Sequence, residues 1–427
     1  MKLIKYPKRR TWSQLLKRPA IDTLALEQTT TEILSKVKSE GDSAIKKLSL
    51  KYEGATIVRP LVNQEELKKA EQNCDSKLKK AISIAFNNIR KFHLAQKEKE
   101  VRLETTDGVT CWRKSVGIEK VGLYIPGGSA PLFSTILMLG IPAKLAGCKE
   151  IILCTPPNSK GELDAAMLFT AKLVGIDKIF KIGGVQAIAA MAYGTETVPK
   201  VYKIFGPGNQ YVACAKQLVN REGVAIDLPA GPSEVAVFAD QTCVPSYVAA
   251  DLLSQAEHGA DSQVLLVSCF DSVIKKILME LEKQLKVLPR KAIASEALKN
   301  SKAVLVLNKD EAFDLLNLYA PEHLILASKN SDKLSSRVVN AGSVFLGNYS
   351  CESAGDYASG TNHTLPTNGH AKAHSGISLD SFVKKITFQK ITKKGIRLLG
   401  STVELMAEAE GLAAHKNAVT LRLKKQA

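Results

Sequence analysis

Apolar residues recur every three or four positions in two long stretches near the N-terminus, at residues 22–50 and 64–97. This spacing predicts amphipathic helices that pack on a core. His93 falls at the edge of the second apolar stripe, so we expect it on the helix surface. Residues 1–20 show no such period and are predicted to form an irregular basic arm.

From residue 101 the pattern changes to that of strands. Residues 101–105 and 109–113 flank Asp107-Gly108, which predicts a tight hairpin. Two series of short apolar runs alternating with helical patterns follow. The first has strands at 121–125, 150–155, 178–182 and 201–205 and helices at 133–146, 165–174, 186–192 and 209–219. The second has strands at 234–239, 263–269, 303–307, 324–327 and 343–346 and helices at 247–258, 272–285, 311–319 and 333–340. The class is therefore α/β with two parallel sheets, a helical N-terminal region and a helical tail after residue 380.

Composition adds limits to this picture. Hydrophobic residues make up 45% of the 427 positions and charged residues 24%, as in an ordinary globular protein. The formal charge is +17, but the basic residues are dispersed and no zinc-finger, zipper or RNP-type pattern accompanies them. We therefore expect neither nucleic acid nor membrane as a partner. Without a signal-peptide pattern or a C-x-x-C pair among the eight cysteines, we expect a cytoplasmic protein.

Glycine-rich turns follow three strands of the first series, at residues 126–129, 183–184 and 206–209. Glycines admit a ligand close to the backbone, and helix N-termini favour phosphate groups. Ordinary tight turns would explain each one alone, but three on one sheet edge favour a nucleotide. Neither G-x-G-x-x-G nor a P-loop is present.

Glu322 and His323 lie where one helix stops at Pro321 and a short strand begins. A carboxylate beside an imidazole gives two proton carriers with different natural pKa values. The alternative is a solvated loop with no chemistry.

Other polar groups mark candidate sites. Gln255 and His258 share the last turn of a helix, although glutamine is not a usual zinc ligand and the spacing alone does not assign a metal. Asp356 and His363 lie in a glycine-bracketed loop, for which an Asx-rich turn is the alternative. Glu410 lies in the tail, just before Gly411.

Six blocks in order resemble the histidinol dehydrogenase family, from about residue 23 to residue 415. They are residues 122–128 (GLYIPGG), 205–209 (FGPGN), 229–234 (PAGPSE), 255–259 (QAEHG), 320–324 (APEHL) and 355–360 (GDYASG). The resemblance implies oxidation of L-histidinol through L-histidinal to L-histidine with reduction of two NAD. It also implies one Zn²⁺ per subunit, two incomplete Rossmann-like domains and a homodimer whose C-terminal tail reaches the partner's site.

The resemblance also implies roles for individual residues. The catalytic pair is Glu322 and His323. The metal positions are Gln255, His258, Asp356 and His415, which also count among the substrate-binding residues. The other substrate-binding residues are Ser233, His323, His363 and Glu410, and the NAD contacts are Tyr124, Gln186 and Asn209. Cys351 departs from the proline that we expect in the family, which concerns only the local loop shape.

The expected domains are an arm (1–20), a discontinuous α/β domain (21–120 and 234–380) with most metal and catalytic residues, an NAD-binding domain (121–233) and a tail (381–427). The chief rival to a dehydrogenase is an NAD-independent zinc hydrolase, although H-E-x-x-H is absent. Two more distant rivals are a nucleic-acid-binding protein and a scaffold with a degenerate site.

Overall fold

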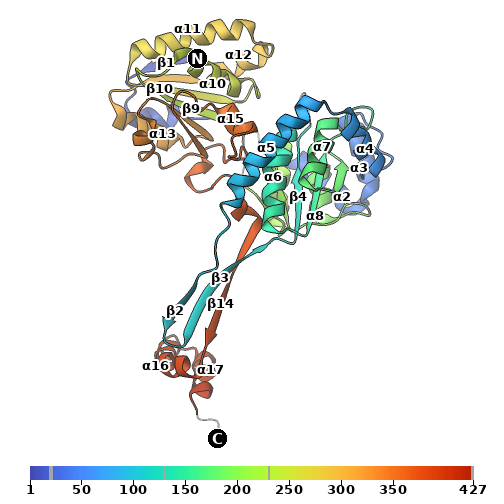
Figure 1. Cartoon of the computed structure of the whole chain (residues 1–427), viewed down its shortest axis with the longest axis vertical. Coiled ribbons are helices and arrows are strands. Elements are labelled where there is room, and N and C mark those ends of the chain that lie inside the picture. Colours follow the sequence, from blue (N-terminus) through green and yellow to red (C-terminus); the bar gives the residue numbers. More distant parts are fainter. Residues whose placement is uncertain (19–22, 128–130, 229–230, 425–427) are drawn as a thin grey trace.

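Two lobes and a projecting stalk make up the chain in a computed structural model, which describes residues 1–18, 23–127, 131–228 and 231–424 (Figure 1). Gly128 and Ser129 of the first glycine-rich turn, and Pro229 and Ala230 of the PAGPSE block, lie outside the described residues. Each lobe is built on a parallel sheet, and the stalk is an antiparallel sheet with two helices at its far end.

The first lobe contains a six-stranded parallel sheet, here called sheet A. Its order is β1 (Lys2–Lys5), β11 (Lys302–Leu305), β10 (Gln263–Ser268), β9 (Glu234–Ala239), β12 (His323–Ala327), β13 (Ser343–Leu346). One face is covered by α10 (Pro245–Ala256), α11 (Asp271–Val287) and α12 (Lys291–Lys299). The other face is covered by α1 (Trp12–Leu15), α13 (Lys309–Tyr319) and α14 (Ser331–Ser335). Because side chains alternate along a strand, Val235 and Val237 enter one core and Ala236 and Phe238 the other.

The second lobe contains a five-stranded parallel sheet, sheet B. Its order is β6 (Lys178–Lys181), β5 (Glu150–Thr155), β4 (Lys120–Tyr124), β7 (Lys203–Phe205), β8 (Ala225–Ile226). One face packs against α4 (Gln64–Asn73), α5 (Ser76–Leu94), α6 (Phe133–Ala146) and α7 (Ala165–Val174). The other packs against α2 (Thr23–Glu40), α3 (Asp42–Glu53), α8 (Gly184–Tyr193) and α9 (Gln210–Arg221).

The two sheets share one strand order. Numbered along the chain within each lobe from β4 and from β9, both run 3-2-1-4-5, which is the Rossmann order without its sixth strand. In sheet A, β1 adds a further parallel strand beside strand 3. The predicted fold class, with two incomplete Rossmann-like sheets, is thus confirmed.

Three predicted boundaries require correction. Helices α2 to α5 share their cores with sheet B, so residues 21–120 do not group with 234–380 as predicted. Figure 1 shows these blue helices on the green lobe. Residues 1–20 are not wholly irregular, because β1 pairs with β11 and Trp12 is buried in the core. The tail beyond residue 380 is not wholly helical, because it begins with a strand, β14 (Val383–Ile391).

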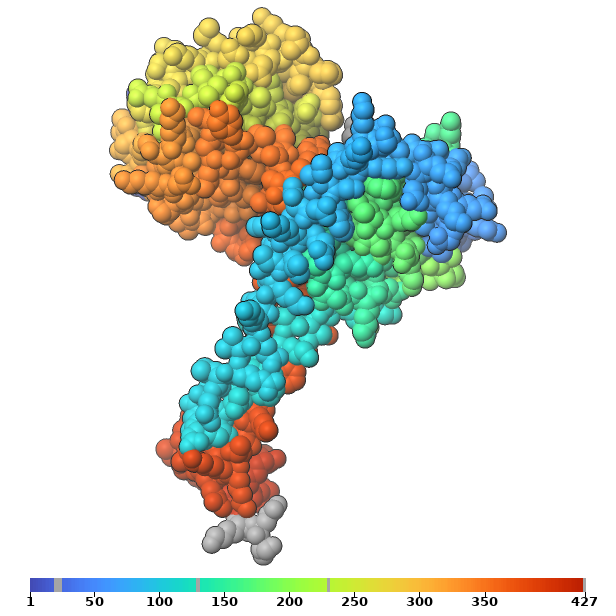
Figure 2. Space-filling view, viewed as in Figure 1, coloured from blue at the N-terminus to red at the C-terminus, as the bar shows by residue number. Residues whose placement is uncertain are grey.

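The stalk is built from β14, β3 (Val109–Gly117) and β2 (Arg102–Thr106), paired antiparallel in that order, which confirms the predicted hairpin. Trp112 stacks on Phe388 across β3 and β14, with ring centroids 5.3 Å apart. Two helices, α16 (Lys393–Ala409) and α17 (Ala413–Leu423), pack together at its far end, reversed at Gly411 with φ of +73°. Figure 2 shows how far they lie from both lobes.

The remaining short helices connect these parts: they are η1 (Arg9–Thr11), α15 (Glu352–Tyr357), η2 (His370–Lys372) and η3 (Leu379–Phe382). Within the described parts of the chain, every helix is too short or too polar to cross a membrane.

Candidate active site between the two lobes

Glu322 and His323 occupy the turn from α13 into β12. Ala320 ends the helix in the left-handed conformation, with φ of +51°, and Pro321 prevents its continuation. His323 then becomes the first residue of β12, in the middle of sheet A between β9 and β13. The two residues are 6% and 4% exposed, so the alternative of a solvated loop is wrong.

The main chain of Glu234 holds both members of this pair. Its N–H donates to Oε2 of Glu322 at 2.9 Å, and its carbonyl oxygen lies 3.2 Å from Nδ1 of His323. Because a carbonyl oxygen can only accept, Nδ1 carries the proton in this contact. The neutral imidazole therefore has its free lone pair on Nε2, which is buried and lacks a hydrogen-bond partner.

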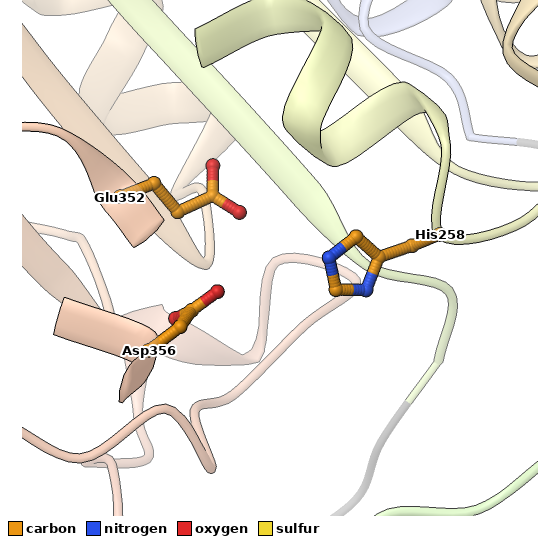
Figure 3. A group of neighbouring side chains, drawn as sticks. All are labelled: His258, Glu352 and Asp356. Atoms are coloured by element: carbon orange, nitrogen blue, oxygen red, sulfur yellow. The ribbon is translucent and has the colours of Figure 1, made fainter. Parts of the chain in front are cut away.

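Two carboxylates and a second imidazole form a cluster (Figure 3), and one of these carboxylates lies close to His323. His258 follows α10, while Glu352 and Asp356 lie four residues apart on α15 and so share a helix face. One ligand atom from each lies within 4.8 Å of the others. Oδ1 of Asp356 is 3.5 Å from Nε2 of His323.

Buried atoms without a hydrogen-bond partner belong to two residues of this cluster and to Gln255, three residues before His258. Among the described residues, both amide atoms of Gln255, Oε2 of Glu352 and Oδ1 of Asp356 have no hydrogen-bond partner. Gln255 and Glu352 are each only 1% exposed. Leaving one such group unpaired costs about 1–3 kcal/mol, and the free oxygens of Gln255, Glu352 and Asp356 fit a ligand that accepts electron pairs. Nitrogen and carboxylate oxygen donors of this kind suit a Zn²⁺ ion.

Burial and the charges of neighbouring groups shift the pKa values of the residues in and beside this cluster. Burial raises the pKa of Glu322 to about 7, against the attraction of His323. Burial likewise raises the pKa of Glu352 to about 8. Burial would lower the pKa of His323, but the charges of Glu352, Glu322 and Asp356 outweigh it and raise the pKa to about 10. A divalent cation among these carboxylates would offset their charge and favour the neutral imidazole that a base requires.

Of the two further predicted substrate residues, His363 borders the cluster and Ser233 directly precedes Glu234 in the chain. His363 places Nδ1 2.9 Å from the backbone oxygen of Asp356. Its Nε2 is 3.1 Å from Oγ1 of Thr135, on α6 of the other lobe, so the two lobes meet here. Ser233 immediately precedes β9 and is partly buried.

The three predicted NAD contacts lie at the carboxyl edge of sheet B, around a cavity of about 920 Å³. The hydroxyl of Tyr124 accepts from the N–H of Gly184 at 3.0 Å, and Gln186 donates to Glu53 at 2.9 Å. Asn209 caps the N-terminus of α9. The cavity lies where the strand order reverses, between β4 and β7, which is where such sheets bind nucleotides.

A close backbone approach explains one of the glycines at this edge. A Cβ on Gly206 would lie 2.0 Å from the backbone oxygen of Tyr124, so only glycine fits there.

Two predicted residues lie elsewhere in the single chain. Glu410, which caps the C-terminus of α16, and His415, on α17, are exposed at the far end of the stalk, well away from α10 and α15 (Figure 1). Conversely, the sequence analysis missed Glu352. Its signal was the four-residue spacing to Asp356, which becomes informative only if residues 352–357 are helical.

Paired Rossmann-order sheets, a cavity where the strand order reverses and a buried carboxylate–imidazole pair are typical of the α/β dehydrogenase class. Comparison with known proteins makes this specific. The profile of the histidinol dehydrogenase family matches residues 16–423. The chain therefore belongs to the histidinol dehydrogenase family, an oxidoreductase family, as its sequence motifs indicated.

Individual relatives agree. Histidinol dehydrogenase of Bacteroides thetaiotaomicron is 58% identical over 423 residues, which cover 99% of both chains. The chloroplastic histidinol dehydrogenase of Arabidopsis thaliana is 52% identical over 413 residues, covering 96% of this chain and 88% of the relative. The crystal structure of histidinol dehydrogenase from Elizabethkingia anophelis superposes with a TM-score of 0.97 at 54% identity, covering 99% of this chain and 98% of that one.

Proposed function

We propose that this enzyme oxidises L-histidinol through L-histidinal to L-histidine and reduces two NAD per turnover, with one Zn²⁺ per subunit. The carrying observation is the buried pair Glu322 and His323 beside the cluster of His258, Glu352 and Asp356, whose carboxylates have unpaired oxygens. Family membership supplies the substrate, since the relatives are named histidinol dehydrogenases.

Gln255, His258 and Asp356 are the residues of this chain that we assign to the metal, with Glu352 beside them. When bound, Zn²⁺ supplies a Lewis acid that fixes the imidazole and amine of the substrate. NAD, bound along Tyr124, Gln186 and Asn209, supplies the hydride acceptor. Ser233 and His363 border the space for the substrate between the two.

His323 moves the protons in this scheme. The carbonyl of Glu234 holds Nδ1–H, so Nε2 is the atom that takes the proton of the substrate alcohol. The same atom serves again when the hydrated aldehyde is oxidised. Burial of the ring excludes bulk water, which keeps the aldehyde from side reactions between the two oxidations.

Glu322 activates the water that adds to the aldehyde. Its Oε2 is fixed by the N–H of Glu234, and its pKa of about 7, raised by burial, suits a base at neutral pH. His323 thus serves in both oxidations, and Glu322 serves only in the second.

The active form that we propose is a homodimer in the cytoplasm. The stalk carries Glu410 and His415 away from the chain's own lobes, and α16 also exposes Leu405 and Met406. Large exposed apolar residues on a projecting element are typical of an interface. His415 would complete the metal ligands of the partner subunit, and Glu410 would contact its substrate.

The test follows the absorbance of reduced nicotinamide with histidinol as the only substrate. Two equivalents per histidinol, lost on chelation and restored by Zn²⁺, support the proposal. Turnover without NAD would favour the zinc-hydrolase alternative, and full activity of a metal-stripped sample would rule out the zinc assignment.

A further inference from the structure

A buried ion pair between Arg18 and Glu234 lies next to the proposed catalytic pair, Glu322 and His323. Nε of Arg18 donates to Oε1 of Glu234 at 2.5 Å and Nη2 donates to Oε2 at 2.7 Å, a two-pronged contact. The side chain of Glu234 is 2% exposed and that of Arg18 17% exposed. The backbone N–H of Asn368 also donates to Oε1 at 2.6 Å. The Glu234 carboxylate therefore accepts three hydrogen bonds, two from Arg18 and one from Asn368.

Arg18 also contacts Tyr319, at the end of the helix that precedes Glu322 and His323. Its Nη2 donates to the backbone oxygen of Tyr319 at 2.8 Å, and its guanidinium lies over the Tyr319 ring at 4.2 Å. Tyr319 is the last residue of α13, three positions before Glu322. One guanidinium thus joins the first residue of β9 to the turn that delivers Glu322 and His323.

Glu234 is the residue whose main chain contacts both catalytic side chains. A shift of Glu234 would therefore displace the Glu322 carboxylate and the His323 ring together. A displacement of about 1 Å at reacting groups can cost about 100-fold in rate. The ion pair is not expected to add much to the free energy of unfolding, because both charges lose their hydration when they are buried.

We propose, building on the proposed function, that Arg18 and Glu234 are positioning residues that set the geometry of the acid–base pair. The hydrogen bonds of the two side chains go to each other and to the backbone of Tyr319 and Asn368, while the charge of the Glu234 carboxylate also acts on Glu322 and His323. Their effect is exerted through the backbone amide and carbonyl of Glu234 and through the turn after Tyr319.

The experiment compares Arg18→Met and Arg18→Lys with a matched control, Arg9→Met. Arg9 joins the same N-terminal segment to the same helix, α13, through Asp314, but the pair is 74% and 49% exposed and remote from the site. In the full-length enzyme loaded with Zn²⁺, kcat and KM are measured for histidinol and for histidinal, together with metal content and melting temperature.

We expect Arg18→Met to lower kcat about tenfold or more on both substrates, with KM within about twofold and metal content unchanged. Arg18→Lys should recover part of this loss, because lysine keeps the charge but not the two-pronged contact. Arg9→Met should match the wild type. Should Arg18→Met fail to fold, Arg18→Lys and Glu234→Gln give the same readout, with kcat again falling at constant KM.

Equal kcat per folded enzyme in the Arg18 and Arg9 variants would overturn the inference, as would a rise in KM at unchanged kcat. Failure of the proposed function is a separate result, since the wild type itself would then reduce no NAD.

Discussion

Nε2 of His363 lies 3.1 Å from Oγ1 of Thr135, a contact that joins the loop after α15 to a helix of the opposite lobe. The other ring nitrogen contacts the backbone oxygen of Asp356 at 2.9 Å. The imidazole is thereby fixed between the proposed metal ligands and the lobe that carries the nucleotide-type cavity.

Thr135→Val should weaken this fixation without altering the shape of α6. Losing one hydrogen bond costs about 1 kcal/mol, so KM for histidinol should rise about fivefold with little change in kcat. Ser134→Ala, a neighbouring buried change on the same helix, is the control and should leave KM unchanged. Equal KM values in both variants would remove His363 from the substrate site.

Glu322→Gln should separate the two oxidations. Without a carboxylate to activate water, oxidation of histidinal should slow by about 100-fold or more, whereas oxidation of the alcohol should slow far less. Rates measured separately with histidinol and histidinal decide this. Equal loss on both substrates would contradict the role assigned to Glu322.

The same variant should change how stability depends on pH. Burial raises the pKa of Glu322 from 4.5 to about 7, so the folded state binds this proton more tightly than the unfolded state. The free energy of unfolding should therefore fall as pH rises from about 4.5 through about 7, by about 3 kcal/mol at most. Metal-stripped Glu322→Gln lacks this loss. Urea unfolding should thus show it more stable than the wild type at pH 8 but not at pH 4.5, and a difference independent of pH would refute the shift.

Glu352→Gln should weaken metal retention. Glu352 offers a buried, unpaired oxygen beside His258 and Asp356, and removing its charge reduces the attraction for a cation. We expect Zn²⁺ affinity, measured by competition with a chelating dye, to fall about tenfold or more. Glu257→Gln, next to His258 but outside the cluster, is the control. Unchanged affinity in Glu352→Gln would assign this carboxylate to another role.

Mixed dimers test whether the tail serves the partner subunit. His415→Ala and Glu322→Gln should each inactivate a homodimer. A heterodimer of the two, purified through different tags, has one site with Glu322 from one chain and His415 from the other. It should regain about half of the wild-type activity per dimer, since one of its two sites is complete. No recovery would mean that each tail serves its own chain.

The alternation of strands and helices was predictable because buried parallel strands are short apolar runs between amphipathic helices. The sequence did not predict which of the two sheets the N-terminal helices pack against. An apolar stripe on α2 or α5 shows that a surface is covered, but not which of two similar sheets covers it. Strand β1 escaped prediction because four residues with lysine at both ends carry too short a pattern.

The burial and contacts of a single histidine could not be predicted from the sequence either. His93 was expected on the surface, yet it is fully buried. Its Nδ1 lies 2.8 Å from the backbone oxygen of Ile89, and its Nε2 is 3.4 Å from Asn362. That second contact comes from a loop 269 residues away, which no helical period can reveal.

The shared strand order of the two sheets has a counterpart in how each one ends. In sheet B, the turns after the two strands at the point of reversal, β4 and β7, line the cavity of about 920 Å³. In sheet A, a hydrogen bond closes the corresponding point between β9 and β12. The hydroxyl of Ser328, just after β12, donates to Asp240, just after β9, at 2.6 Å, and both residues are buried. The crevice that we propose for NAD therefore exists in sheet B alone, and the proposed acid–base pair lies at the opposite, amino edge of sheet A.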